Sequence, residues 1–211
     1  MNNLLLIWGA GGHGKVVLDI ARGTRSFERI VFLDDDRTRA GLAFCNCPVL
    51  AGLDELQRFA GSAFAIAVGD NRMRSLCFER ALGVGLLPTA LVHSTAVIAP
   101  SADIGRGTVV MPGVIVNAAA VIGENCIINS GAIVEHDCTI GPNAHISPRA
   151  VLGGGVNVGA LVHIGLGAVV LPGVTVGEES VVGAGAVVLH EVPARCTVVG
   201  VPAKALPTRS H

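Results

Sequence analysis

The sequence predicts two structural units, a small α/β domain over residues 1–88 and an all-β coil of short strands over residues 89–211. Strands alternate with helical segments in the first part of the chain, and an aliphatic residue returns at every sixth position in the second. The composition agrees with this division. With 28 glycines, six phenylalanines, one tryptophan and no tyrosine, the chain suits thin repeated layers better than a core of large side chains.

The bulk composition excludes several classes of protein. Of the 211 residues, 51% are hydrophobic and 15% are charged, and the formal net charge is −1, so we expect no nucleic-acid partner. The N-terminus lacks the features of a signal peptide, and no apolar stretch approaches the ~20 residues that span a bilayer. We therefore expect no membrane insertion. The six scattered cysteines fit buried thiols in a reducing compartment, which indicates a cytoplasmic protein.

Three strands are expected in the first unit. A strand over residues 3–8 runs into the glycine-rich turn Gly9-Ala10-Gly11-Gly12-His13-Gly14-Lys15, and a helical pattern begins at Val16. A second strand over residues 30–33 ends in Asp34-Asp35-Asp36, and a third over residues 64–68 ends in Gly69-Asp70-Asn71. This alternation predicts a small parallel α/β sheet.

The glycine-rich turn indicates a phosphate or sugar ligand. It matches GxGxxG through Gly9, Gly11 and Gly14, and Asp34 follows at the spacing of a dinucleotide site. A domain of about 85 residues, however, supplies only one of the two mononucleotide halves that grip a dinucleotide. Glycines let the backbone approach a phosphate or sugar at a helix N-terminus. The turn favours a nucleotide or nucleotide sugar, and NAD binding or a purely structural turn stay open.

An unbroken six-residue repeat organises the second unit. A period of six is neither helical nor a simple strand alternation. It fits a short strand plus a tight turn, with the aliphatic side chain inward and small residues at the crowded corners. The repeated positions are Val92, Ile98, Ile104, Val110, Val116, Ile122, Ile128, Val134, Ile140, Ile146, Leu152, Val158, Ile164, Val170, Val176, Val182 and Val188.

This repeat resembles that of the bacterial hexapeptide acyltransferases, which fold as a left-handed parallel β-helix. In that fold three hexapeptides make one triangular coil, so residues eighteen apart stack. Together with the repeat, the motifs GAGGHGKVV, FLDDD, AVGDNRMR, VEHDC and GVPAK resemble the NeuD/PglD-type sugar O- and N-acetyltransferases over essentially the whole chain. The resemblance implies a Rossmann-like domain for a nucleotide sugar over residues 1–88. It implies an acyltransferase β-helix with a C-terminal tail over 89–211, acetyl-CoA as co-substrate, and a homotrimer.

The same resemblance assigns site residues. The family's catalytic histidine falls on His136, and the acidic residue that raises its basicity falls on Asp137. The acetyl-CoA contacts fall on His145, Leu166 and Ala184. The substrate contacts fall on Gly11, Gly12, His13, Asp34, Asp35, Gly69 and Asn129.

The residues themselves suit acetyl transfer. Transfer from a thioester to an amine needs a base, and a histidine with an ordinary pKa of about 6.5 serves at cellular pH. His136 stands between Glu135 and Asp137, and the sequence leaves open which carboxylate partners it. We expect N-acetylation of a nucleotide-linked amino sugar, at C4 by the resemblance. O-acetylation of a sugar hydroxyl and a non-catalytic nucleotide-binding subunit stay open.

Two other chemistries, a covalent cysteine route and a metal site, are less favoured by the sequence. A covalent route through Cys138 is less favoured, because we expect this thiol to fill an inward position. His163 should stack on His145, and such a pair can ligate a metal. The histidine spacings do not match those of the γ-class carbonic anhydrases that share this fold, so we expect no metal.

The period also bears on assembly. His136 and His145 are nine residues apart, which is half a coil, so we expect them on different faces of one prism. A site that uses both would lie between neighbouring subunits. Outward positions are often apolar or small, and such faces tend to be buried against another copy. We take Val109, Val114, Ala118, Ala120 and Val169 as examples.

Overall fold

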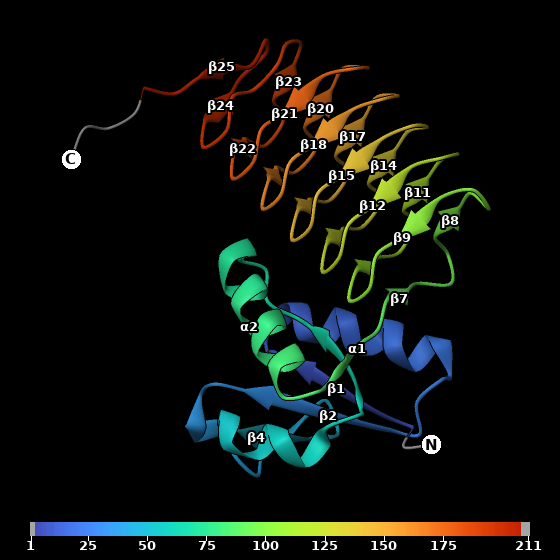
Figure 1. Ribbon diagram of the computed structural model, residues 1–211, viewed down its shortest axis with the longest axis vertical. Coiled ribbons are helices and arrows are strands. Elements are labelled where there is room, and N and C mark those ends of the chain that lie inside the picture. Colours follow the sequence, from blue (N-terminus) through green and yellow to red (C-terminus); the bar gives the residue numbers. More distant parts are fainter. Residues whose placement is uncertain (1–2, 208–211) are drawn as a thin grey trace.

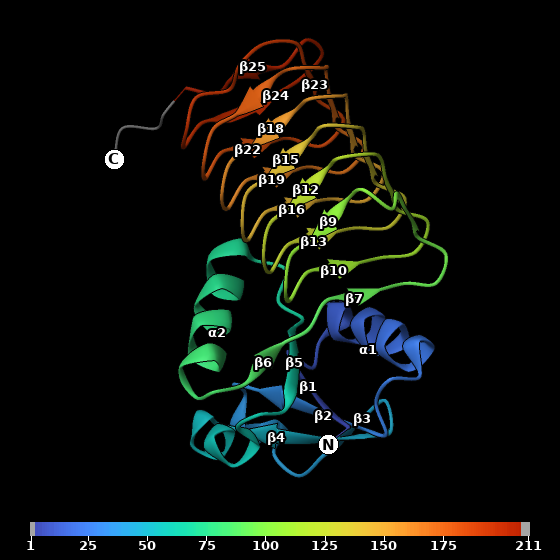
Figure 2. The same ribbon diagram turned by 45° about the vertical axis from the view of Figure 1, so that its right-hand side comes forward.

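The computed structural model describes residues 3–207 and confirms the predicted fold class. A three-sided β-helix stands on a small α/β domain, with the chain entering at the base and leaving at the far end (Figure 1). Each coil of the β-helix is a triangle with one short strand on each side (Figure 2).

The α/β domain is built on a six-stranded sheet with the order β3-β4-β2-β1-β5-β6. Its strands are parallel except for the β3–β4 pair. Their bounds are β1 Leu4–Trp8, β2 Arg29–Asp34, β3 Ala43–Phe44, β4 Cys47–Ala51, β5 Ala63–Ile66 and β6 Leu87–Pro88. The helices are α1 Gly12–Thr24 and α2 Asn71–Gly83, with 3₁₀ turns η1 Arg37–Arg39 and η2 Leu53–Phe59.

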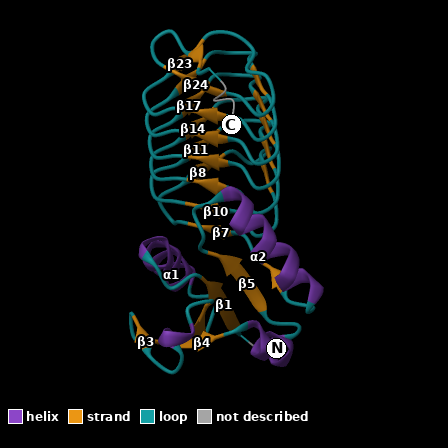
Figure 3. Ribbon diagram, turned by 90° about the vertical axis from the view of Figure 1, so that its left-hand side faces the viewer, coloured by secondary structure: helices purple, strands orange, loops and turns teal. Residues whose placement is uncertain are grey.

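Strand alternation divides the residues of β1 between two cores. Leu5 and Ile7 pack with α1 residues such as Val17 on one side of the sheet. Leu6 and Trp8 belong with α2 residues such as Phe78 on the other. The two helices therefore cover opposite faces of the sheet (Figure 3). The α1 side is continuous with the core of the β-helix, so α1 lies between the sheet and the first coil.

The β-helix has three faces of stacked strands. Face I holds β7 Leu91–Val92, β10 Val109–Val110, β13 Ile127–Ile128, β16 His145–Ile146, β19 His163–Ile164, β22 Val181–Val182, β24 Thr197–Val199 and the antiparallel β25 Lys204–Ala205. Face II holds β8 Val97–Ile98, β11 Ile115–Val116, β14 Ile133–Val134, β17 Val151–Leu152, β20 Val169–Val170 and β23 Val187–Val188. Face III holds β9 Asp103–Ile104, β12 Val121–Ile122, β15 Thr139–Ile140, β18 Asn157–Val158 and β21 Thr175–Val176.

The six-residue repeat predicts this structure closely. Each repeated aliphatic residue is the second residue of a two-residue strand, and the register Val110↔Ile128 shows the eighteen-residue stacking. Glycine after the aliphatic residue is required at the corner between faces III and I. A Cβ on Gly141, for example, would lie 2.6 Å from the backbone nitrogen of Ala160 in the next coil. Backbone atoms of adjacent coils therefore leave no space for a side chain there.

Two of the five predicted outward positions are wrong. Val114 and Ala120 are fully buried, because the side chain two residues before the inward aliphatic also points inward. Val109 does face outward from face I but is 1% exposed, since the α/β domain packs against the base of that face. Ala118 is exposed and Val169 half-buried. The outward apolar row is instead the first strand position of face II, which is aliphatic in every coil, namely Val97, Ile115, Ile133, Val151, Val169 and Val187.

The stretch from Gly83 to Leu87, whose glycines and leucines are typical of a linker, is part of the sheet. α2 ends at Gly83, Leu86 is 2% exposed, and Leu87 pairs with Ala63 of β5. The stretch is the last crossover of the sheet, and only two residues separate β6 from β7 at the start of the β-helix.

Candidate active site

The glycines of the first turn divide into two kinds. Gly9 has φ +116°, and a Cβ there would lie 2.7 Å from the carbonyl oxygen of Ala67. A Cβ on Gly14 would collide with the carbonyl of Gly9, so this glycine lets α1 approach the end of β1. Gly11 and Gly12 have nothing within 4 Å of an added Cβ. Only these last two leave open space where the backbone of a helix N-terminus can meet a ligand.

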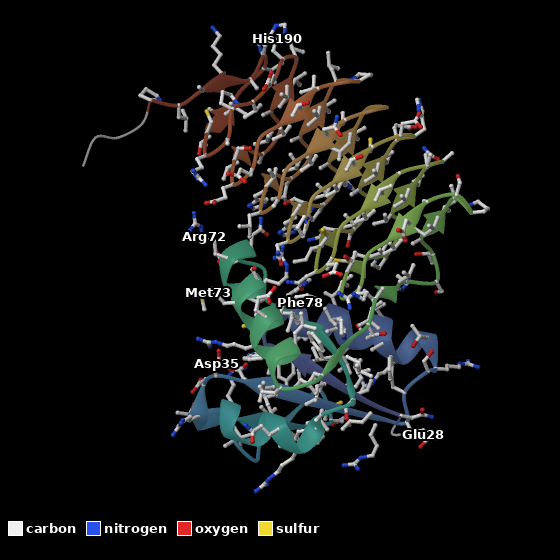
Figure 4. The ribbon with its side chains drawn as sticks, in the orientation of Figure 1. Glu28, Asp35, Arg72, Met73, Phe78 and His190 are labelled. Atoms are coloured by element: carbon white, nitrogen blue, oxygen red, sulfur yellow. The ribbon has the colours of Figure 1, made fainter. Side chains whose placement is uncertain are left out.

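The aspartates after β2 have different surroundings. The Asp34 carboxylate accepts hydrogen bonds from the backbone nitrogens of Ala10 at 2.8 Å and Asp36 at 3.0 Å, and it lies 3.8 Å from Arg39. Asp34 thus orders the glycine-rich turn. Asp35 is exposed and lies on the same side of the molecule as the first turn of α2 (Figure 4). The structure therefore leaves the Asp35 carboxylate available to a ligand, whereas that of Asp34 already has protein partners.

His13 completes this edge of the sheet. It is half-buried in the first turn of α1, and its buried Nε2 has no hydrogen-bond partner among the described residues. Burial first, and then the charge of Arg74, lower the pKa of His13 to about 4. His13 is therefore neutral at cellular pH. Gly69 follows β5, which is adjacent and parallel to β1, so the loops that bear His13 and Gly69 leave the same edge of the sheet.

The N-terminus of α2 abuts face I of the β-helix. Asn71 donates from Nδ2 to the carbonyl oxygens of Leu161 at 2.9 Å and Val162 at 3.0 Å, and Arg72 pairs with Glu179. Figure 4 shows Arg72 at the end of α2 nearest the coils. A cavity of about 510 Å³ lies at this junction. Its lining residues are Gly69, Asp70, Asn71, Arg72, His145, Leu161, His163, Glu179 and Val181.

Two stacked histidines form the β-helix side of this cavity. The His145 and His163 rings are parallel within 1°, with centroids 4.9 Å apart, as the eighteen-residue spacing predicted. Burial first, and then His163 and Arg74, lower the pKa of His145 to about 3. The pKa of His163 is also lowered, mainly by burial. Both rings are therefore neutral hydrogen-bonding groups. Within residues 3–207 no three metal-type side chains gather around them.

Asn129 fixes the tautomer of His145. The Asn129 Oδ1 accepts from the backbone nitrogen of Ser130 at 2.8 Å, which leaves Nδ2 to donate to His145 Nε2 at 3.0 Å. The proton of the neutral His145 ring is consequently on Nδ1. His163 Nε2 contacts the Ser147 hydroxyl at 2.8 Å in the next coil.

His136 lies elsewhere, at the corner between faces II and III. Its side chain is 62% exposed, and its Nδ1 lies 2.7 Å from the Asp137 carboxylate. That hydrogen bond is the largest cause of the raised pKa of His136. The ring rests over Gly154 in the next coil, where a Cβ would lie 2.6 Å from Nε2. Nε2 is left as the free nitrogen of an imidazole whose orientation is fixed.

Asp137, and not Glu135, partners the histidine. Asp137 has φ 60°, a left-handed turn conformation that brings its carboxylate beside the preceding side chain. Glu135 instead accepts from Asn117 at 2.8 Å in the coil below. Cys138 is fully buried, its thiol donates to the carbonyl oxygen of Gly153 at 3.2 Å, and burial raises its pKa. The thiol fills an inward position, as expected.

The remaining predicted residues lie at the corner between faces I and II. Leu166 and Ala184 occupy this corner in successive coils, and both are exposed. Asn129 occupies it lower down. The structure thus brings Asn129 and His145 together and places Leu166 and Ala184 above them. It does not bring His136 to them within one chain, because face II separates the two corners.

Sequence reasoning missed the residues at the junction of the two units. Asn71, Arg72 and Glu179 line the cavity, and Arg74 lies behind it. Asn71, Arg72 and Arg74 lie in the motif AVGDNRMR, which supports the family resemblance but does not by itself indicate a role for these side chains. The pairing of α2 with coil corners 69 and 90 residues away has no local signal in the sequence.

Comparisons with known proteins agree with the two-unit organisation. The profile described as PglD N-terminal domain matches residues 4–81, and that described as bacterial transferase hexapeptide (six repeats) matches residues 119–154. UDP-N-acetylbacillosamine N-acetyltransferase of Bacillus subtilis (strain 168) is 41% identical over 116 residues. That match spans 53% of this chain and 52% of the relative, about half of each.

Two solved structures match over nearly the whole length. Perosamine N-acetyltransferase from Caulobacter crescentus, a histidine-to-asparagine variant in complex with CoA and GDP-perosamine, has a TM-score of 0.91 and 38% identity over 96% of both chains. The acetyltransferase domain of PglB from Neisseria gonorrhoeae FA1090, in complex with acetyl coenzyme A, has a TM-score of 0.91 and 39% identity over 98% of this chain and 100% of that one. The coil shared with these proteins is the left-handed parallel β-helix.

Proposed function

This chain belongs to the hexapeptide-repeat family of sugar-nucleotide N-acetyltransferases, and from that premise we propose that it transfers the acetyl group of acetyl-CoA to the amine of a nucleotide-linked amino sugar with His136 as general base. The observation that carries the proposal is the His136–Asp137 pair. A base that removes a proton from the attacking amine needs a fixed imidazole with a free nitrogen and a raised pKa. His136 has an exposed Nε2 without a partner among the described residues, and Asp137 holds its ring and raises its pKa.

The reaction balances with this one base. The neutral amine attacks the thioester carbonyl, and His136 Nε2 takes the amine proton as the tetrahedral intermediate forms. The intermediate then collapses, the carbon–sulfur bond breaks, and the CoA thiolate takes the proton from the His136 imidazolium, which regenerates the base. Asp137 holds the ring by Nδ1 and stabilises the imidazolium between these events. No covalent intermediate on Cys138 enters, because that thiol is buried and its pKa is raised.

Each unit holds one substrate in this proposal. Gly11, Gly12 and Asp35 present open backbone and a free carboxylate at the sheet edge, which suits a nucleotide sugar. Leu166 and Ala184 form an exposed edge in successive coils for acetyl-CoA. The resemblance implies C4 as the position of the amine. In this proposal the two substrates meet at the cavity that Gly69 and His145 both line.

We further propose a homotrimer with the reaction site between subunits. The aliphatic row of face II is exposed or half-buried in one chain, and burial against a second copy removes it from water. Its two edges are the corners that carry His136 and Asn129. Packing through face II therefore brings the His136 of one subunit toward the His145 and Asn129 of the next, which a single chain keeps apart.

The proposed setting is the cytoplasm. All six cysteines are free, which suits a reducing compartment, and acetyl-CoA and nucleotide sugars are cytoplasmic metabolites. In the described part of the chain no helix is long and apolar enough to cross a bilayer. Nucleic acid is not proposed as a partner because the net charge is −1.

The test is release of free CoA thiol from acetyl-CoA with UDP-, GDP- and dTDP-linked 4-amino sugars, each beside its 4-hydroxy counterpart. We expect turnover with at least one amino sugar and a product acetylated on nitrogen. Turnover with the hydroxy sugars alone would replace the N-acetyltransferase with an O-acetyltransferase. Binding of acetyl-CoA without turnover on any acceptor would contradict the catalytic proposal.

A further inference from the structure

Arg74 is an unusual residue at the junction of the two units. It lies on the first turns of α2 and is 0% exposed, yet the described residues offer its guanidinium no carboxylate within ion-pair distance. Burying an unpaired charge is strongly unfavourable unless hydrogen bonds replace its hydration. The buried guanidinium therefore depends on its hydrogen bonds to backbone and side-chain oxygens of both units.

On the α/β side, the guanidinium binds the end of β5. Its Nη1 donates to the carbonyl oxygens of Val68 and Gly69, each at 3.2 Å, and its Nη2 donates to Asn71 Oδ1 at 2.7 Å. Gly69 is one of the predicted substrate contacts and lines the cavity. Arg74 thus fixes the peptide of Gly69 and the side chain of Asn71 at the same time.

On the β-helix side, the guanidinium binds stacked corner carbonyls. Its Nε donates to Asn125 at 2.9 Å, and its Nη2 donates to Asn143 at 2.7 Å and to Ala144 at 3.3 Å. Asn125 and Asn143 have φ values of 54° and 60°, the left-handed corner conformation repeated in successive coils. Ala144 directly precedes His145. One side chain therefore joins the peptide of Gly69 to the peptide before His145.

We propose that Arg74 is a positioning residue for acetyl transfer, which sets where the nucleotide sugar held at Gly69 stands relative to His145. This proposal rests on the proposed function. Reacting groups held in near-attack geometry gain much of their rate from placement, and a displacement of about 1 Å can lower the rate about 10²-fold. Planar guanidinium donors reach both units at once, which a single ammonium group does not do.

The cation also acts on the histidines around it. Burial is the largest cause of the low pKa of His145, followed by His163 on β19, Arg74 on α2 and His13 on α1. Asp70, which precedes α2, acts in the opposite sense on Arg74 and on His163. Removing the Arg74 charge should therefore raise the pKa of His145 from about 3 toward, but not to, its ordinary value.

The first experiment compares Arg74→Met and Arg74→Lys in the full-length protein with two controls. Arg80→Met removes an exposed cation from the same helix, and Phe78→Leu loosens the packing of α2 against Gly107 without touching a charge. We expect kcat to fall about 10- to 100-fold in Arg74→Met, with an unchanged KM for acetyl-CoA. Arg74→Lys should recover little of the loss, because one ammonium cannot span both sets of carbonyls. Both controls should keep wild-type kcat.

Two further measurements separate positioning from mere folding. Added methylguanidine should restore part of kcat to Arg74→Ala but not to Phe78→Leu. The NMR titration of His145 should show a higher pKa in Arg74→Met than in wild type, and no change in Arg80→Met; this reading needs no activity.

The outcomes are distinct. Wild-type kcat in Arg74→Met and Arg74→Lys would overturn the proposal, as would losses matched by Phe78→Leu and insensitive to methylguanidine. An unchanged pKa of His145 in Arg74→Met would also count against it. If wild type acetylates no amino sugar but the titration shifts as expected, the proposed function fails while the link from Arg74 to His145 stands.

Discussion

In the β-helix, a Cβ added to Gly141 would lie 2.6 Å from the backbone of the next coil, whereas one added to Gly12 in the α/β domain would meet nothing within 4 Å. The first glycine is required by the protein itself. The second leaves a space that the protein does not fill. The same contrast holds for the histidines, because His136 is an exposed group on a coil of the β-helix and His13 is a half-buried one at the edge of a sheet. One unit supplies fixed placement, and the other supplies an open surface for a ligand.

The sharpest test of this contrast is His136→Ala. Loss of the proposed general base should lower kcat by about 10²- to 10⁴-fold, while the affinity for the nucleotide sugar, which we propose the other unit holds, stays unchanged. Steady-state kinetics and calorimetry measure the two quantities. His190→Ala removes another exposed histidine from the same corner between faces II and III, three coils farther along the β-helix, and serves as the control (Figure 4). Full turnover by His136→Ala would show that another group is the base.

The paired substitutions Gly141→Ala and Gly12→Ala test the two kinds of glycine directly. We expect Gly141→Ala to lower the free energy of unfolding by about 1–3 kcal/mol, the usual range for overpacking, because backbone atoms must move. Gly12→Ala should leave stability within about 0.5 kcal/mol, as for a surface substitution. It should instead weaken nucleotide-sugar binding. Denaturant titrations measure the free energy of unfolding of both variants, and calorimetry measures their affinity for the nucleotide sugar. Equal destabilisation of the two variants would contradict the distinction between the two kinds of glycine.

Ala184→Trp examines the acetyl-CoA edge of the β-helix. A bulky side chain at this exposed corner should block the ligand and raise KM for acetyl-CoA about tenfold, which corresponds to ~1.4 kcal/mol. KM for the nucleotide sugar should not change, since we propose that the α/β domain holds that ligand. Ala184→Ser is the matched control. An unchanged KM for acetyl-CoA in the Trp variant would place the cofactor elsewhere.

Asp137→Asn should give the smallest effect, a shift in pH dependence. The Asp137 carboxylate raises the pKa of His136, so removing its charge lowers that pKa. His136 must be neutral to accept a proton, and the acidic limb of the kcat/KM profile should therefore move to lower pH. Asparagine tolerates the left-handed conformation of residue 137, which keeps the turn intact. A limb that stays in place, or moves to higher pH, would argue against the pairing.

The sequence predicts the two units unequally. The hexapeptide period predicts the strands, the stacking of His145 on His163 and the separation of His136 from His145, because one rule of geometry repeats along the coil. In the α/β domain, the strands at 29–34 and 63–66 lie where apolar runs indicated them. Strand β4, which contains Pro48, and the two-residue β3 and β6 carry too weak a local pattern.

The site shows the same limit. His136 and its partner lie in one motif, but which acid it uses depends on the left-handed turn at Asp137, which the alternation of strand residues does not reveal. Arg74 looks like an ordinary helix cation in the sequence. Its burial follows from the docking of α2 onto coil corners, a contact between residues 74 and 143 that no periodicity encodes.

The stacked corners that receive α2 have a consequence for how this architecture can vary. Coils rise by the strand spacing of about 4.8 Å, and they can be gained or lost only whole. The height of His136 above the docked helix can therefore change only in steps of one coil. In a relative with one more coil between the docked helix and this histidine, the histidine would lie about 4.8 Å farther from the sheet. To accept a shorter or longer sugar, such a scaffold must change its loops and docking helix, because its coils permit no fine adjustment.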